Sequence, residues 1–305
     1  MILQHGYLTN PTAQHEFDTP GKISLSQAFR ESFNAQFKRG SVGLWILFGL
    51  LGTILSTAII VVAQIILGAG EQSTTFGEDV TEVSPSPLAL AVGMLLMLIG
   101  FFVSIYFTVG IQKGYIRGYD SGNPQLGDLF VKDFSVVGRM LLSSILVTLL
   151  SFAVTLPIII ITFVLMALTG DLGSSDPTIP VGPMIFYVVA AMTVNCIVSV
   201  LMYFYAISIV DSGVGAVDSI KVSYHAAKKN FLTILGIVVA SAAILVIPLI
   251  VIVLVFSLMG IAGAIIGAIL AMAYVFVMYG PLTVVRVSAY RQAVGGPTAT
   301  SVPGR

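Results

Sequence analysis

The sequence predicts an all-α polytopic membrane protein with six transmembrane helices, arranged as three hairpins that each follow a cytoplasmic amphipathic helix. Hydrophobic residues make up 57% of the 305 residues and charged residues 9%, whereas about 25% of a soluble domain is charged. The hydrophobic residues also lie in six runs, each longer than the about 20 helical residues that cross a bilayer core. This composition excludes a soluble enzyme, a disordered chain and a nucleic-acid-binding protein.

The six predicted spans contain no Asp, Glu, Lys, Arg or His. Transmembrane β-strands are excluded, because apolar and polar residues alternate along such strands over about ten residues, whereas these runs are continuously apolar. The spans cover residues 42–68, 87–111, 140–168, 184–210, 231–259 and 261–285.

The loops between the spans predict the orientation. Loops 71–86 and 170–183 are acidic and contain no Lys or Arg, and all 14 basic residues lie on the other side of the membrane. Because basic residues gather on the cytoplasmic side, both termini are predicted to be cytoplasmic. Residues 1–22 and 291–305 are expected to be disordered tails, which leaves 23–290 as the membrane domain.

An amphipathic helix is predicted before the first, third and fifth spans, to lie on the membrane surface or dock against the bundle. The first is expected to begin with a capping box of Ser24 and Gln27, and to hold Glu31 away from its apolar stripe. A shift of 191 residues aligns Ser32 with Ser223, which indicates a repeated unit. The apolar stripes are Leu25, Phe29, Phe33 and Phe37 in the first helix, Leu126, Phe130 and Phe134 in the second, and Val217, Ile220, Tyr224 and Phe231 in the third.

Basic residues at the predicted cytoplasmic surface are candidates for contact with anionic lipid head groups, where each nearby Lys or Arg contributes about 1 kcal/mol. They are Lys38, Arg39, Arg139, Lys228 and Lys229.

Polar residues of the fourth span form a candidate polar interior of the bundle, at Thr193, Asn195 and Ser199. The Asn195 amide is expected to hydrogen-bond across helices or to line a cavity. Helix kinks are predicted where a proline removes a backbone hydrogen bond, at Pro157, Pro248 and Pro281.

No catalytic site is predicted. The spans hold no carboxylate or imidazole for acid–base chemistry, and the single Cys196 excludes an internal disulfide and a Cys-built metal site. The acids on the cytoplasmic side, among them Asp128 and Asp211, are interleaved with basic residues and indicate solvated helix faces. The sequence therefore predicts no cofactor, no metal and no enzymatic activity.

Two cytoplasmic segments carry a family resemblance. The run GYIRGYDSGNPQLGDLF at 114–130, followed by Gly138 and Arg139, and the run AVDSIKVSYHAAKKNF at 216–231 resemble the YciC-like group of bacterial membrane proteins. A similar membrane domain precedes some glycerophosphodiester phosphodiesterases. The resemblance implies a six-span protein of the bacterial cytoplasmic membrane and carries no catalytic residue over.

These observations predict a non-enzymatic accessory or scaffold protein in envelope or lipid homeostasis, with anionic membrane lipids as partners and no nucleic acid. A permease for an uncharged or amphiphilic substrate, such as a lipid, is the alternative. Small residues four apart in the last span, at Gly263, Gly267 and Ala271, favour close helix packing within one copy or between copies of a homo-oligomer. A membrane-protein partner fits the scaffold interpretation equally.

The orientation predicts which positions an impermeant thiol reagent reaches in intact cells. Cysteine at Ser73 or Ser174 should be labelled, because both positions fall in the acidic outer loops, while cysteine at Ser121 should be protected. Labelling at Ser121 with protection of the other two would reverse the assigned orientation.

Overall fold

The computed structural model describes residues 21–37, 71–76, 80–85, 87–121, 125–169 and 181–295, with a few positions between 50 and 65. The predicted tail 1–22, apart from its last two residues, and most of the predicted first span, 42–68, lie outside the described residues. So do Lys38 and Arg39.

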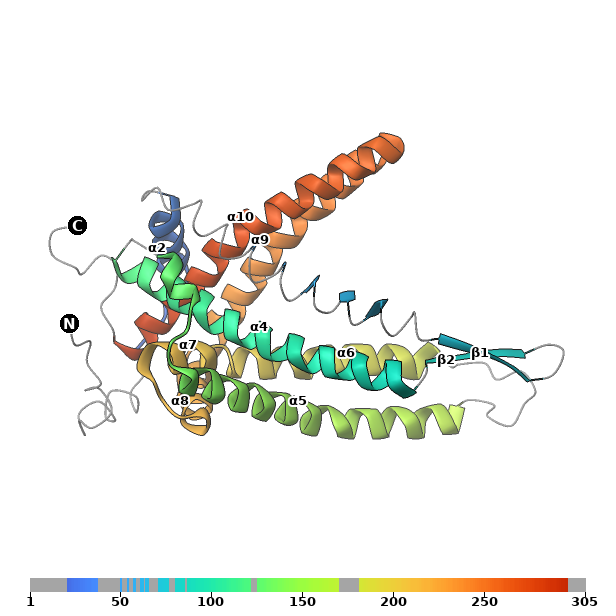
Figure 1. Cartoon of the computed structure of the whole chain (residues 1–305). Helices are drawn as coiled ribbons and strands as arrows, with labels where there is room; N and C mark the ends of the chain where they lie inside the picture. The colour runs from blue at the N-terminus through green and yellow to red at the C-terminus, as the bar shows by residue number, and fades with distance from the viewer. Residues whose placement is uncertain are drawn as a thin grey trace. The chain divides into compact units, whose positions relative to one another are not determined.

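The described chain is mostly helical (Figure 1). In chain order the elements are α2 (Leu25–Phe37), β1 (Glu71–Phe76), β2 (Val80–Pro85), α4 (Pro87–Ser121), η1 (Leu126–Leu129, a 3-10 helix), α5 (Phe134–Thr169), α6 (Val181–Leu201), α7 (Tyr205–Ser212), α8 (Ala216–Lys229), α9 (Phe231–Ser257) and α10 (Gly260–Val294).

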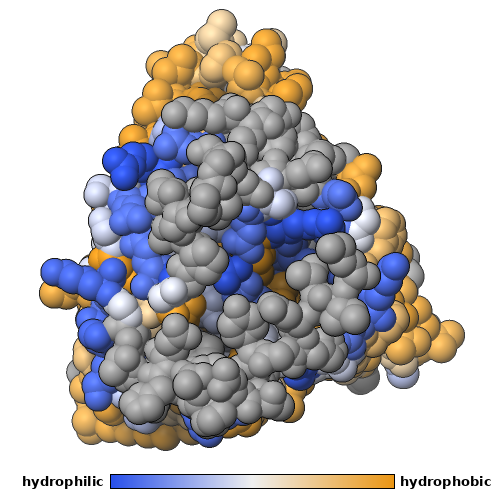
Figure 2. Space-filling model, turned by 90° about the vertical axis from the view of Figure 1, so that its left-hand side faces the viewer, coloured by the Kyte–Doolittle hydropathy of each residue, from blue (hydrophilic) through white to orange (hydrophobic). Residues whose placement is uncertain are grey.

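Five described segments are helices long and apolar enough to cross a membrane, at Leu90–Ser121, Phe134–Leu168, Val181–Ser212, Phe231–Ser257 and Ala262–Val294. They correspond to the second through sixth predicted spans. In lipid a helix satisfies its own backbone groups, which is why such apolar runs become helices. The surface that they expose is hydrophobic (orange in Figure 2), with Phe163 72% and Leu232 80% exposed. The chain is therefore an integral membrane protein.

The acidic segment 71–86 contains the one β-element among the described residues. Strands β1 and β2 pair antiparallel, in a register that runs from Glu71 opposite Pro85 to Phe76 opposite Val80. From the sequence, this segment was expected to form a loop. The segment's β-branched Thr and Val residues favour strands and were the signal for this hairpin.

The chain divides into two compact units, which are described separately. One consists of Met1–Ala28, Arg139–Ala242 and Ala289–Thr298, and the other of Phe29–Gly138, Ala243–Ser288 and Ala299–Arg305.

In the first unit, the segment before α2 is held by side chains from the α8–α9 junction and the end of α10. The Asn230 amide accepts a hydrogen bond from Ile23 N (3.0 Å) and donates to Gly21 O (2.9 Å). Ser24 N donates to the Gln292 side chain (2.7 Å), which takes the place that the predicted capping box gave to Gln27. Gly21 is required here, because a Cβ on it would lie 2.4 Å from the Gln292 carbonyl oxygen.

In the second unit, α2 buries a carboxylate against α4 and α10. Glu31 is 4% exposed, and its Oε2 accepts hydrogen bonds from the Tyr119 hydroxyl (2.6 Å) and the Ser288 hydroxyl (2.8 Å). The neighbouring Ser32 hydroxyl donates to the carbonyl of Pro281 in α10. The sequence placed Glu31 only away from the apolar stripe and did not predict its burial, in which two buried hydroxyl groups replace water around the carboxylate.

The prediction of a second amphipathic helix, before the third span, is wrong. Only the 3-10 helix η1 forms among the described residues of this segment. The Asp133 side chain accepts a hydrogen bond from Ser135 N (2.9 Å) and so caps the start of α5, which separates α5 from η1. The predicted stripe is exposed, with Phe130 63% and Phe134 70% accessible, whereas Leu129 is 2% exposed.

Segment η1 packs directly on α4. A Cβ on Gly110 would lie 2.4 Å from the Leu129 carbonyl oxygen, so only glycine permits this approach. Asp128, which is 3% exposed, pairs with Arg117 at 2.8 Å. This buried carboxylate corrects the prediction of a solvated helix face.

The C-terminal boundary of the membrane domain also lies further on than predicted. Helix α10 continues to Val294, and Arg291 forms an ion pair with Asp211 at 2.8 Å in which both side chains are mostly buried. Next to it the hydroxyl groups of Ser212 and Tyr290 lie 3.0 Å apart. Residues 291–294 are thus part of the fold, and Asp211 does not lie on a solvated face.

The Glu31 contacts predict the effect of removing one hydroxyl group. Tyr119→Phe keeps the ring in place but leaves the buried carboxylate with one fewer donor, which should lower the free energy of unfolding by about 2 kcal/mol. Thermal unfolding in detergent measures this against Tyr224→Phe, which removes a hydroxyl from a partly exposed ring. Equal melting temperatures for the two variants would show that the Glu31 contact does not stabilise the fold.

Candidate functional site

Helix α8 is the described surface element that best fits the predicted contact with lipid head groups. It starts after Gly213, whose φ of +65° ends α7 in the left-handed conformation, and the Arg139 guanidinium donates to the Gly213 carbonyl. Asp218 lies in the first turn of α8, and Lys228 and Lys229 lie in the last. This distribution of charge is favourable to the helix dipole.

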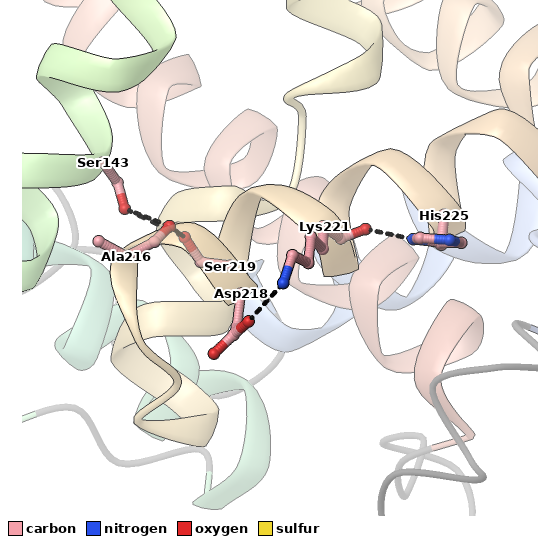
Figure 3. A network of polar contacts seen from close by, with 6 residues as sticks. All are labelled: Ser143, Ala216, Asp218, Ser219, Lys221 and His225. Atoms are coloured by element: carbon pink, nitrogen blue, oxygen red, sulfur yellow. Dashed lines mark hydrogen bonds and ion pairs between the residues drawn. The ribbon is translucent and has the colours of Figure 1, made fainter.

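One face of α8 is buried and consists of small residues. Ser219 and Ser223 are both 0% exposed. The Ser223 hydroxyl donates to Leu201 O of α6 (2.8 Å) and accepts from Phe204 N (3.0 Å). The Ser143 hydroxyl of α5 lies 3.1 Å from that of Ser219. These bonds fix α8 against α5 and the end of α6, and Figure 3 shows the contact of Ser143 with Ala216 and Ser219.

The opposite face of α8 is exposed and combines apolar with basic side chains. Val217, Lys221, Tyr224 and Lys228 recur at helical spacing, and all four are exposed, Val217 by 53% and Tyr224 by 38%. We call these four residues the α8 stripe. The large apolar residues thus point outward, because the small ones allow close packing with the spans.

The charges on this face are available to an external anion. Lys221 contacts Asp218 at 3.2 Å, but both side chains are 66% exposed, and such pairs contribute about 0–1 kcal/mol. The Lys228 ammonium lies 5.8 Å from the centre of the Tyr224 ring, a cation–π distance. His225 packs edge-on against Tyr224 and contacts the Lys221 carbonyl oxygen at 2.8 Å. The lysines of α8 outnumber its one acid, so the face is basic.

The structure places the five predicted head-group residues differently from one another. Lys228 and Lys229 are exposed on α8. Arg139 is half-buried and engaged with the α7–α8 turn. Lys38 and Arg39 lie outside the described residues, so the structure brings no more than two of the five together on one exposed helix.

The predicted polar interior is not enclosed in the described structure. Thr193, Asn195 and Ser199 are all exposed on α6. The Asn195 amide nitrogen donates to Ala191 O (2.9 Å) and, at a longer 3.4 Å, to the Thr155 hydroxyl of α5. The expected hydrogen bond across helices is therefore present. Thr193 donates to Val189 O within its own helix.

The three prolines lie inside their helices, Pro157 in α5, Pro248 in α9 and Pro281 in α10.

Three polar contacts of structural weight were not found from the sequence. They are the Glu31 cluster, the Asn230 contacts and the Asp211–Arg291 pair. The position of Asn230 directly before the fifth span could have indicated its contacts, because a side-chain amide at the end of a span has backbone groups within hydrogen-bonding reach. The other two join residues far apart in the chain, for which one sequence carries no signal.

Within the described ranges, no group of three His, Cys, Asp or Glu side chains lies close enough to hold a metal ion. No protein-family model, curated protein or solved structure matches the chain.

Proposed function

We propose that this protein is a non-enzymatic membrane protein that binds anionic phospholipid head groups at α8, as an accessory or scaffold of the bacterial cytoplasmic membrane. The location and the tie to the YciC-like group rest on the sequence resemblance. The single observation that carries the proposal is the α8 stripe, where lysines and outward-facing apolar side chains share one exposed face.

Such a face suits the boundary between head groups and acyl chains. An interfacial helix buries its apolar side chains in that boundary and holds its basic side chains at the phosphates. Val217 and Tyr224 supply the apolar part of the stripe, and Lys221 and Lys228 supply the basic part, with Lys229 beside them.

The anchoring of α8 supports a static role. The Ser143 hydroxyl of α5 donates to Ala216 O of α8, and the Ser223 hydroxyl of α8 bonds to Leu201 O and Phe204 N at the α6–α7 junction. The basic side chains therefore project from a fixed helix. A preorganised set of charges loses little conformational freedom on binding a phosphate. This arrangement favours retention of lipid over chemistry performed on it.

Neutralising the three lysines tests the proposal. The triple change Lys221→Gln, Lys228→Gln and Lys229→Gln should weaken retention of phosphatidylglycerol in native mass spectrometry more than tenfold, since each lysine contributes about 1 kcal/mol. Retention of zwitterionic phosphatidylcholine should stay unchanged.

The matched control removes the same charge from three other exposed lysines, with the changes Lys22→Gln, Lys113→Gln and Lys132→Gln. These should reduce phosphatidylglycerol retention far less. Equal loss in both triple variants would indicate a response to net charge and contradict a site on α8.

A further inference from the structure

Helix α6 carries an exposed face whose polar groups are only partly satisfied. Its residues Ile185, Val188, Met192, Asn195 and Ser199 are spaced three and four apart alternately, and all are exposed, Met192 by 69% and Ile185 by 58%. Exposed apolar side chains are expected in lipid and carry no information by themselves. The amide and the hydroxyl at one end of this face are the unusual feature.

These two polar residues lie at membrane depth. Asn195 is 14 residues from the start of α6 at Val181, which places it about 21 Å along the helix, within a hydrocarbon core about 30 Å thick. Its partner Thr155 in α5 lies 14 residues from the end of that helix at Thr169, at a matching depth. Water is scarce there, so a polar atom without a partner is costly.

The hydrogen bonds leave one acceptor and one donor open. The amide nitrogen of Asn195 donates to Ala191 O and to the Thr155 hydroxyl. Within the described chain, its Oδ1 accepts no hydrogen bond and the Ser199 hydroxyl forms none. An acceptor and a donor one helical turn apart on the same exposed face are therefore both available to a partner.

We propose that this face of α6 is the contact between two copies of the chain. Two copies inserted in the same orientation are related by a two-fold axis along the membrane normal, so α6 meets α6 at equal depth and each contact occurs twice. Asn195 Oδ1 of each copy then accepts from the Ser199 hydroxyl of the other. The alternating spacing of three and four is that of a helix–helix seam, in which a single Asn sets register and oligomeric state.

The acceptor points to a second copy of this chain as the occupant. Acyl chains have no hydrogen-bond donor to offer at this depth, whereas Ser199 supplies one from the same face at a helical spacing of four. Both amide hydrogens of Asn195 are already engaged, so the pairing of acceptor with hydroxyl is also the one that the intrachain contacts leave open.

Cysteine crosslinking of the full-length protein in native membranes tests the seam. With Cys196→Ser as background, Met192→Cys should form a covalent dimer with a short membrane-permeant bis-maleimide. Ile197→Cys should not, because Ile197 is also exposed, at 42%, but lies about half a turn away from the seam. Equal crosslinking at the two positions, or none at Met192→Cys, would overturn the proposal.

Two further changes in the Met192→Cys protein test the polar contact. Ser199→Ala and Asn195→Val should each weaken association about tenfold, because the bond occurs twice and each bond contributes a factor of roughly three. Thr155→Val is the control, since it removes the intrachain partner of Asn195 but leaves Oδ1 in place, and it should dimerise like the parent. The Ser199 hydroxyl forms no hydrogen bond with the described residues, so undiminished dimerisation of Ser199→Ala would contradict the proposed contact.

Discussion

The described fold depends on one constraint: backbone groups that leave a helix next to an apolar medium need partners. Asn230 meets this need where α8 ends and α9 begins. Its side chain accepts from Ile23 N and donates to the carbonyl groups of Gly21 and Ala226. Gly21 N in turn donates to Ala293 O at 2.6 Å. One amide thereby fixes the segment from which α2 starts.

Serine hydroxyl groups also attach the surface helices α2 and α8 to long helices. At an offset of 191 residues, Ser32 matches Ser223, and each hydroxyl donates to a backbone carbonyl group of a long helix, in α10 and α6 respectively. Ala35 and Ala226, which match at the same offset, are 4% and 3% exposed. In α8, the small residues and serine hydroxyl groups pack against the long helices, and the large apolar and basic residues of the α8 stripe lie on the exposed face.

Composition and hydropathy predicted the parts of the fold that lipid determines. Runs without charge must become helices in a bilayer, so the second through sixth spans are helices. The amphipathic pattern before the fifth span predicted the exposed helix that carries Lys228 and Lys229. Hydrophobic periodicity failed where polar contacts decide. It indicated a solvated face for Asp211 and gave no sign that Glu31 is buried, because their partners Arg291, Tyr119 and Ser288 come from remote segments. It extended a helix through η1, where the Asp133 cap of α5 intervenes.

The central claim is that polar side chains at the helix ends hold the surface segments in place. Hydrogen exchange at the Ile23 amide tests it most directly, because this amide donates to Asn230 Oδ1. Asn230→Ala should speed that exchange by roughly tenfold or more, the loss expected for one buried hydrogen bond. Lys228→Ala, which changes an exposed neighbour, should leave it unchanged. An Ile23 amide that exchanges equally slowly without the Asn230 side chain would contradict the account.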